Sequence, residues 1–203
     1  MALVLNGSGN ITGLSAGGLP DGSVTADDIA STLDLSGKTV TLPAGTGGKV
    51  LQVVQAVKTT SDSYTLNTTF ADITGLSQAI TPTNTSSKIL ITAHVTVGSQ
   101  NGSTASYPKI RLVRDSTNIG ISIDSGSRQK VTAMWWPGSV DANATGVMSM
   151  TFLDSPSTTS STTYKIQVFG SQNRTFYVNR CGSDENTAGG HAISTLTLME
   201  IAG

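Results

Sequence analysis

The chain has 203 residues and a formal net charge of -1, with 12 Lys and Arg against 13 Asp and Glu. Only 12% of its residues are charged, about half the usual share near 25%. This argues against a helix-rich protein, because exposed helix faces need Glu, Lys and Arg. The near-neutral balance argues against nucleic acid as a partner, since phosphate binding needs a clustered basic field. The apolar runs are too short to span a bilayer, and the start lacks the basic flank and apolar core of a secretory signal, so we expect no membrane insertion.

Residues 1–48 predict an extended, Gly-rich attachment segment. They contain no aromatic residue. Thr25 can cap a short helix, because Asp28 follows three residues later in the position of a capping-box acid. Such a helix would end near Leu33 and would be marginal by itself in water. We therefore expect it to dock on a partner through Thr25, Asp28, Ile29 and Leu33, and we expect a short strand over Lys38–Leu42 to follow.

Residues 49–203 predict an all-β domain. β-branched residues and alternating apolar and polar side chains dominate there; every second residue from Ile89 to Val97, for example, is apolar. Many short strands separated by turn clusters are typical of a β-sandwich or jelly roll. The predicted fold class is therefore all-β: a jelly-roll-like β-sandwich head after the Gly-rich segment. We predict strands at Val50–Lys58, Phe70–Ile73, Gln78–Thr81, Lys88–Gly98, Lys109–Asp115, Asn118–Ile123, Lys130–Trp136, Gly146–Leu153, Thr163–Gly170, Arg174–Asn179 and His191–Ile201.

The motifs that would support an enzyme fail on inspection. Gly45–Lys49 is similar to a phosphate-binding loop, but Pro43 stands where the first glycine belongs and Val50 follows where Ser or Thr should hold magnesium. The neighbouring acids of Asp27–Asp28 and of Asp184–Glu185 do not face one another on a regular element. They are therefore poor acid–base pairs, although a glycosidase-type pair assembled across subunits stays open. We predict no catalytic residues.

Metal and cofactor sites have no support either. Cys181 is the only cysteine, which excludes an internal disulfide and a cysteine-based zinc site. His94 and His191 are the only histidines, and their spacing matches no ligand motif. We predict no metal and no cofactor.

Aromatic residues are the strongest candidates for contact with a ligand. Trp135 and Trp136 are adjacent on a predicted strand, so their rings should point to opposite faces. One ring would pack in the core and the other would reach solvent, a neighbouring subunit or a ligand, since an exposed Trp is a good platform for sugars and a common interface anchor. Tyr107 and Tyr177 invite the same two interpretations. The candidate recognition loops are Gln100–Pro108, Asp124–Gln129, Pro137–Thr145 and Arg180–Gly190.

Several segments resemble a known group of proteins. They are residues 19–30 (LPDGSVTADDIA), 110–120 (IRLVRDSTNIG), 152–156 (FLDSP), 163–168 (TYKIQV) and 194–201 (STLTLMEI). With them the chain resembles small tail-fibre and related virion proteins of tailed bacteriophages, particularly marine and cyanobacterial ones.

The resemblance implies a non-enzymatic virion structural protein. It implies a homotrimer, with the N-terminal segments attached to other virion proteins of the tail, portal adaptor or capsid. The heads would contact a glycan or protein on the host cell surface. Trp135, Trp136, Tyr107 and Tyr177 are then the candidate receptor-binding residues, and Thr25, Asp28, Ile29 and Leu33 the candidate virion-attachment residues.

Two other functions stay open. A capsid decoration protein that clamps the shell would have the same composition and the same division of the chain. A polysaccharide-degrading tailspike is disfavoured, because the chain has no repeated β-helix period and few acids.

Overall fold

The structure is a computed structural model that describes residues 4–5, 11–12, 50–66, 69–99, 107–123, 126–136, 142–170, 173–183 and 189–203. The chain divides into two compact units, Met1–Gly47 and Gly48–Gly203. In the first unit, β1 (Val4–Leu5) pairs antiparallel with β2 (Ile11–Thr12). The predicted helix from Thr25 to Leu33 and the predicted strand Lys38–Leu42 lie outside the described residues.

The second unit is built from strands, and its described residues contain no helix, so the all-β prediction is confirmed. The strands are β3 (Val50–Lys58), β4 (Asp62–Leu66), β5 (Phe70–Ile80), β6 (Lys88–Ser99), β7 (Lys109–Arg114), β8 (Thr117–Ile119), β9 (Ala133–Met134), β10 (Thr145–Asp154), β11 (Thr162–Phe169), β12 (Arg174–Val178) and β13 (Ser194–Ile201).

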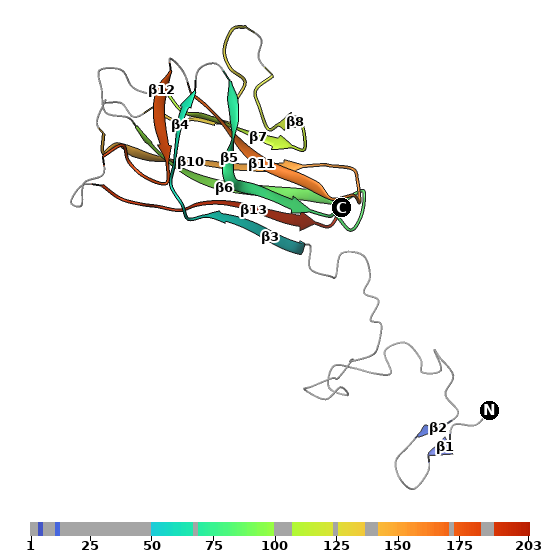
Figure 1. The fold of residues 1–203 in the computed structure, drawn as a ribbon. Coiled ribbons are helices and arrows are strands. Elements are labelled where there is room, and N and C mark those ends of the chain that lie inside the picture. The colour runs from blue at the N-terminus through green and yellow to red at the C-terminus, as the bar shows by residue number, and fades with distance from the viewer. Residues whose placement is uncertain are drawn as a thin grey trace. The chain divides into compact units, whose positions relative to one another are not determined.

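Two antiparallel sheets form a sandwich with the strand pairing of a jelly roll (Figure 1). The first sheet contains the order β3-β13-β6-β10, and the second has the order β5-β11-β7-β8. The pairs are nested along the chain: β3 pairs with β13, β5 with β11, β6 with β10 and β7 with β8. The outermost pair in this sequence order therefore joins strands that are far apart in the chain, and the innermost pair joins consecutive strands, as in a jelly roll.

The core lies between the inner faces of the two sheets. Each long strand turns every second side chain inward, which is the period that a pleated strand dictates. The fully buried members of the core, with no exposed surface, are Leu76, Ile89, Ile91, Ala93, Val95, Val97, Ile110, Leu112, Tyr164, Ile166, Val168, Phe176, Val178, Leu196 and Leu198. Tyr164 satisfies its hydroxyl by donating to Asp154 Oδ2 at 2.7 Å, and Arg114 Nη1 forms a salt bridge with the same carboxylate at 2.8 Å.

The first sheet forks along one edge of β6. β10 pairs with one edge of β6 over its whole length. The other edge of β6 is shared by two strands. β13 pairs with residues 88–94 of β6, and β12 pairs with residues 97–99. β4 pairs in turn with β12. At the fork, Thr96 donates its backbone N–H to Ser194 Oγ at 3.0 Å and accepts the backbone N–H of Asn179 at 2.9 Å.

Asn179 holds the fork together. It has no exposed surface and a φ of 64°, a left-handed conformation that Asn tolerates better than most residues. Its Nδ2 donates to Lys58 O at 2.8 Å and to Thr60 O at 2.9 Å, and its Oδ1 accepts from Ser194 Oγ at 2.5 Å. One side chain thus joins the end of β3, the end of β12 and the start of β13.

Several predicted strand limits were wrong, and pairing explains them. Phe70–Ile73 and Gln78–Thr81 are one strand, β5, because the chain passes through a register shift against β11 with Gly75 at a φ of 84° and stays in the same sheet. The strands predicted at Asn118–Ile123 and Lys130–Trp136 shrink to β8 and β9, since both must share one edge of the six-residue β7.

Two further limits differ at the first sheet. β4 was not predicted, because Asp62–Leu66 follows a polar run and is ordered by pairing with β12. The last predicted strand began at His191, but β13 begins at Ser194, and His191 forms only an isolated bridge with Arg180.

Candidate functional site

The sandwich has two different ends. At the proximal end, the start of β3 meets the end of β13, since Val50 pairs with Ile201 and Ile201 with Lys88. The C-terminus lies at this end in Figure 1. The opposite, distal end is where β6 ends and β7 begins. The chain therefore enters the domain at the proximal end, where β3 begins.

Described residues at the ends of three of the four predicted recognition loops meet at the distal end. Ser99 donates its backbone N–H to Ala144 O at 3.0 Å, and Gly182 donates its N–H to Ala142 O at 2.7 Å. The residues that flank the loops Gln100–Pro108, Pro137–Thr145 and Arg180–Gly190 are thus hydrogen-bonded to one another. The fourth loop, Asp124–Gln129, lies between β8 and β9 in the sequence, and these two strands pair with the same edge of β7.

Trp135 and Trp136 point in opposite directions, as predicted for neighbours on a strand. Trp135 is partly buried and packs against the core, where its indole lies against Gly146 so closely that a Cβ at that glycine would overlap the ring. Trp136 is 70% exposed. Tyr107 meets the Trp136 ring edge-on, with ring centroids 5.7 Å apart and an interplanar angle of 85°. Two of the four candidate residues, Tyr107 and Trp136, therefore form one exposed aromatic pair.

A row of side chains on the outer face of the second sheet leads up to this pair. Phe70, Phe169, Lys109 and Met134 are directly opposite one another across β5, β11, β7 and β9. The two phenylalanine centroids are 5.1 Å apart, and Lys109 Nζ lies 5.1 Å from the Phe169 centroid. Met134 ends the row 70% exposed, one residue before the tryptophan pair.

The next row across the same face is charged and internally paired. Arg111 covers the Phe70 ring at 3.7 Å and donates from Nε to Gln167 Oε1 at 2.8 Å. Gln167 Nε2 donates to Asp72 Oδ1 at 2.6 Å, and Lys165 Nζ lies 2.8 Å from Asp72 Oδ2. Desolvation raises the pKa of Asp72, but the hydrogen bonds from Lys165 and Gln167 outweigh it and hold that pKa below its usual value. This network fixes Arg111 over Phe70.

Tyr177 belongs to a different part of the distal end. It lies on β12 of the first sheet, under the guanidinium of Arg180 at 4.0 Å from the ring centroid. Arg180 donates from Nη1 to Cys181 O at 3.2 Å. The sequence could not separate Tyr177 from the Tyr107–Trp136 pair, because which sheet each tyrosine joins depends on long-range pairing.

Arg180 also lines a pocket of about 280 Å³ that sequence patterns did not predict. Its volume is near the lower end, about 300 Å³, of small-molecule sites. Arg180 and His191 bring side chains that bind polar groups, and Gly189 and Gly190 leave backbone accessible there. The full lining is Thr96, Asn143, Thr145, Arg180, Cys181, Gly189, Gly190, His191 and Ala192.

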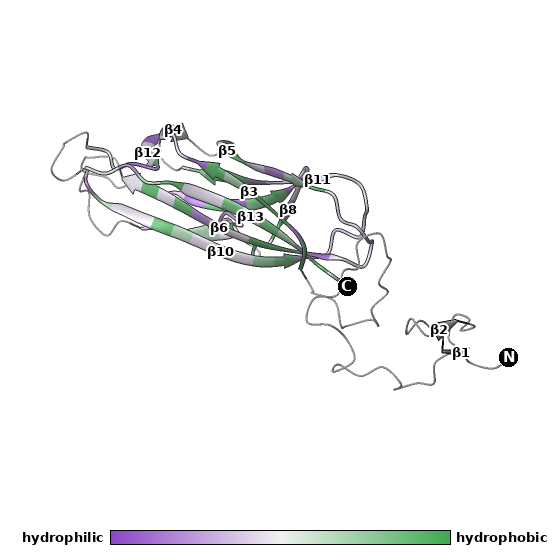
Figure 2. Cartoon of the chain, turned by 90° about the horizontal axis from the view of Figure 1, so that it is seen from below, coloured by the Kyte–Doolittle hydropathy of each residue, from purple (hydrophilic) through white to green (hydrophobic). Residues whose placement is uncertain are grey.

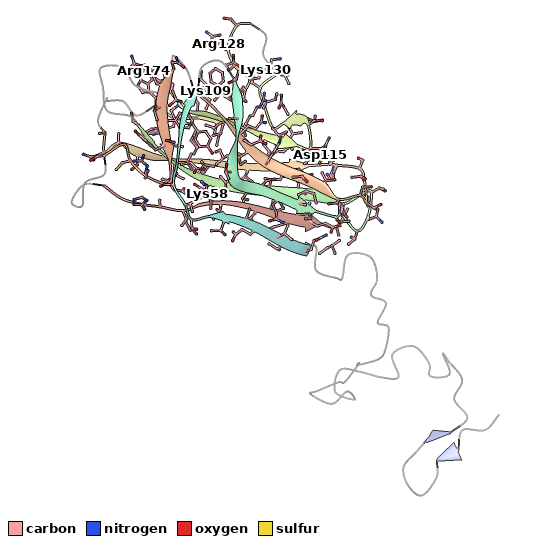
Figure 3. All side chains as sticks on the ribbon, in the orientation of Figure 1. Lys58, Lys109, Asp115, Arg128, Lys130 and Arg174 are labelled. Atoms are coloured by element: carbon pink, nitrogen blue, oxygen red, sulfur yellow. The ribbon has the colours of Figure 1, made fainter. Side chains whose placement is uncertain are left out.

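Cations outnumber acids around the outer face of the second sheet. The salt bridges among the described residues use Lys58, Arg114 and Lys165 as their cations. Arg128 and Lys130 are exposed on the segment between β8 and β9, and Figure 3 shows both, with Lys109, on the side of the sandwich away from β3. Within the part of the chain that the structure describes, none of these three has a carboxylate partner in a salt bridge.

Other kinds of site are not seen in the described part of the chain. No group of three or more His, Cys, Asp or Glu side chains gathers there in a way that could hold a metal ion. No helix in that part is long and apolar enough to cross a membrane. The predicted attachment residues Thr25, Asp28, Ile29 and Leu33 lie outside the described residues.

Comparisons with known proteins give a weak likeness among solved structures. No family model matches the sequence, and no curated protein matches it. Among solved structures, the chain is similar to a protein in the structure of infectious bursal disease virus, Gx strain, with 14% sequence identity and a TM-score of 0.37. The likeness covers 81% of this chain and 41% of the viral chain, so the chain spans less than half the length of that protein.

Proposed function

We propose that the protein is a non-enzymatic structural subunit of a virus particle, of the tail-fibre kind, and that its distal end contacts the host cell surface. The observation that carries the proposal is the difference between the two ends of the jelly roll. The chain enters and finishes at the proximal end, and the exposed Tyr107–Trp136 pair and the pocket beside Arg180 belong to the distal end. Residues 1–48 then attach the domain to the particle, and three such chains form the fibre.

The chemistry of the distal end supports a glycan as the receptor. Trp136 is 70% exposed, so most of its side chain is available to stack on a sugar, and Tyr107 packs against it with the two rings nearly perpendicular. Trp and Tyr suit such a site because their rings are apolar at one end and polar at the other. Arg128 and Lys130 add positive charge for acidic sugars. The loops lie on a rigid sandwich, which is the usual arrangement for recognition.

The experiment is a binding assay with the full-length chain. Labelled protein is titrated onto marine bacterial and cyanobacterial cells and onto their purified envelope polysaccharides. We expect saturable binding that weakens at least tenfold in Trp136→Ala, because removing an aromatic side chain that the bound ligand covers typically costs more than about 1.4 kcal/mol. Val50→Ala is the matched control, since Val50 is an apolar residue that is half exposed and lies at the proximal end, at the start of β3.

Two outcomes would refute the proposal. Binding that is equal in the wild type, Trp136→Ala and Tyr107→Ala would remove the aromatic pair from the site. A gold label on the chain that decorates the shell, and not the tail, of intact particles would replace the fibre with a capsid decoration protein.

A further inference from the structure

The outer face of the first sheet carries no Asp, Glu, Lys or Arg between its ends. We name it the uncharged face; its residues are Leu51, Val53, Gln55 and Val57 of β3, Ile193, Thr195, Thr197 and Met199 in and before β13, Leu90, Thr92, His94 and Thr96 of β6, and Val147, Ser149, Thr151 and Leu153 of β10. Figure 2 shows these four strands side by side, with hydropathy alternating along them. At the proximal edge the first charge beyond the face is Lys88, and at the distal edge Arg180 lines a pocket together with Thr96.

Large apolar side chains are concentrated on this face. Val53, Val147 and Ile193 are each more than half exposed, at 55%, 58% and 56%. One register row, Val53–Met199–Leu90–Leu153, is apolar across all four strands. The outer face of the second sheet is different, since it carries the ion pair of Lys165 with Asp72. The two outer faces are therefore built for different surroundings.

Several polar side chains on the uncharged face are already paired within the sheet. Gln55 Nε2 donates to Thr197 Oγ1 at 2.7 Å, across β3 and β13. His94 Nδ1 and Ser149 Oγ share a hydrogen bond of 2.9 Å, across β6 and β10. Covering a polar group costs free energy mainly when its hydrogen bonds are lost. This face can be covered at low cost, because these bonds stay in place when water leaves.

We infer that further copies of this chain pack on the uncharged face. Two identical faces without charge do not repel one another, and they offer nothing that would select an oppositely charged partner. Four strands about 4.8 Å apart and about eight residues of about 3.4 Å give a flat area of roughly 500 Å², which corrugated side chains increase. That approaches the ~600–800 Å² per partner of specific interfaces. Self-association through this face therefore depends on protein concentration.

The test is the mass of the full-length chain in solution. Sedimentation over a range of concentrations should give a whole-number multiple of 20.8 kDa. Val53→Arg and Thr151→Arg place like charges on the β3 and β10 sides of the face in every copy. Both positions are exposed, so both variants should keep the circular dichroism spectrum and melting temperature of the wild type. We expect each variant to raise the dissociation constant at least tenfold.

Asn118→Arg is the matched control, since Asn118 is exposed on β8 of the other sheet; it should associate as the wild type does. The inference is overturned if the folded wild type has the mass of one chain at every concentration. It is also overturned if both face variants associate normally, or if Asn118→Arg dissociates the protein as strongly as they do. Cell binding by a single-chain protein would overturn this inference and the three-chain fibre, and would leave the host contact of the proposed function standing.

Discussion

Glu200 makes the stability of this domain sensitive to acid. Its side chain has no exposed surface and no cation beside it in the described part of the chain. Gln52 Nε2 donates to Oε2 at 2.6 Å, and the backbone N–H and the hydroxyl of Thr83 both donate to Oε1 at 2.7 Å. The carboxylate thereby ties the turn after β5 to β3 and β13 at the proximal end.

The magnitude follows from the pKa of that carboxyl. Desolvation raises the pKa of Glu200, but the hydrogen bonds from Gln52 and Thr83 outweigh it and bring it to about 2, from an ordinary value of 4.5. Because the folded pKa is the lower one, the stabilisation is complete above the unfolded pKa and is lost as the pH falls from about 5 to about 2. A pKa difference of about 2.5 between the folded and unfolded states corresponds to about 3 kcal/mol in the free energy of unfolding at neutral pH.

Urea denaturation between pH 7 and pH 2 measures this. Glu200→Gln should lower the free energy of unfolding by about 2–3 kcal/mol at pH 7, and the wild-type and variant curves should converge as the pH approaches 2. Asp115→Asn is the control, because Asp115 is an exposed turn carboxylate that accepts a backbone hydrogen bond from Thr163; with Glu200 intact, this variant should keep the acid sensitivity of the wild type. Parallel curves for the wild type and Glu200→Gln would refute the reasoning.

Three further predictions test the packing, each through the free energy of unfolding in urea. Asn179→Ala should lose about 3 kcal/mol, because it leaves several buried partners unsatisfied; a loss below about 1 kcal/mol would mean that water replaces the side chain. Trp135→Ala should cost about 3 kcal/mol and Trp136→Ala less than about 0.5 kcal/mol, and equal large losses would contradict the opposite orientations. Gly146→Ala should cost about 2 kcal/mol by overpacking against Trp135, whereas Gly190→Ala, whose Cβ meets nothing within 4 Å, should be near neutral; equal effects would show that the indole can move aside.

Sequence patterns predicted the long central strands well and the edges poorly. β6 and β13 are buried on one face over most of their length, so apolar side chains recur at every second position in their own sequences and predict the strands. β8 and β9 exist only where β7 offers them an edge, and β4 only because β12 pairs with it. Two strands were predicted on either side of Gly75, where the structure has one strand with a register shift, because a glycine inside a strand can mark either a bulge or a turn.

The distal end shows the same limit for sites. That one of Trp135 and Trp136 is partly buried and the other exposed was predicted from strand alternation, although both lie beyond Met134, the last residue of β9. That Trp136 meets Tyr107, 29 residues earlier, depends on the pairing of β9 with β7. Asn179 had no sequence signal, because the carbonyl groups that it binds at Lys58 and Thr60 are some 120 residues away. The pocket beside Arg180 likewise brings together four separate segments.

The position of β3 has a mechanical consequence. Tension that draws the chain before Val50 away from the distal end runs lengthwise along β3, parallel to its partner β13. The inter-strand bonds are perpendicular to that direction, and the pairing extends from Lys58 with Ser194 to Val50 with Ile201. Such a load acts in shear on all the hydrogen bonds between β3 and β13 together and does not break them one at a time. This resistance to tension suits the attachment to a host cell that we propose.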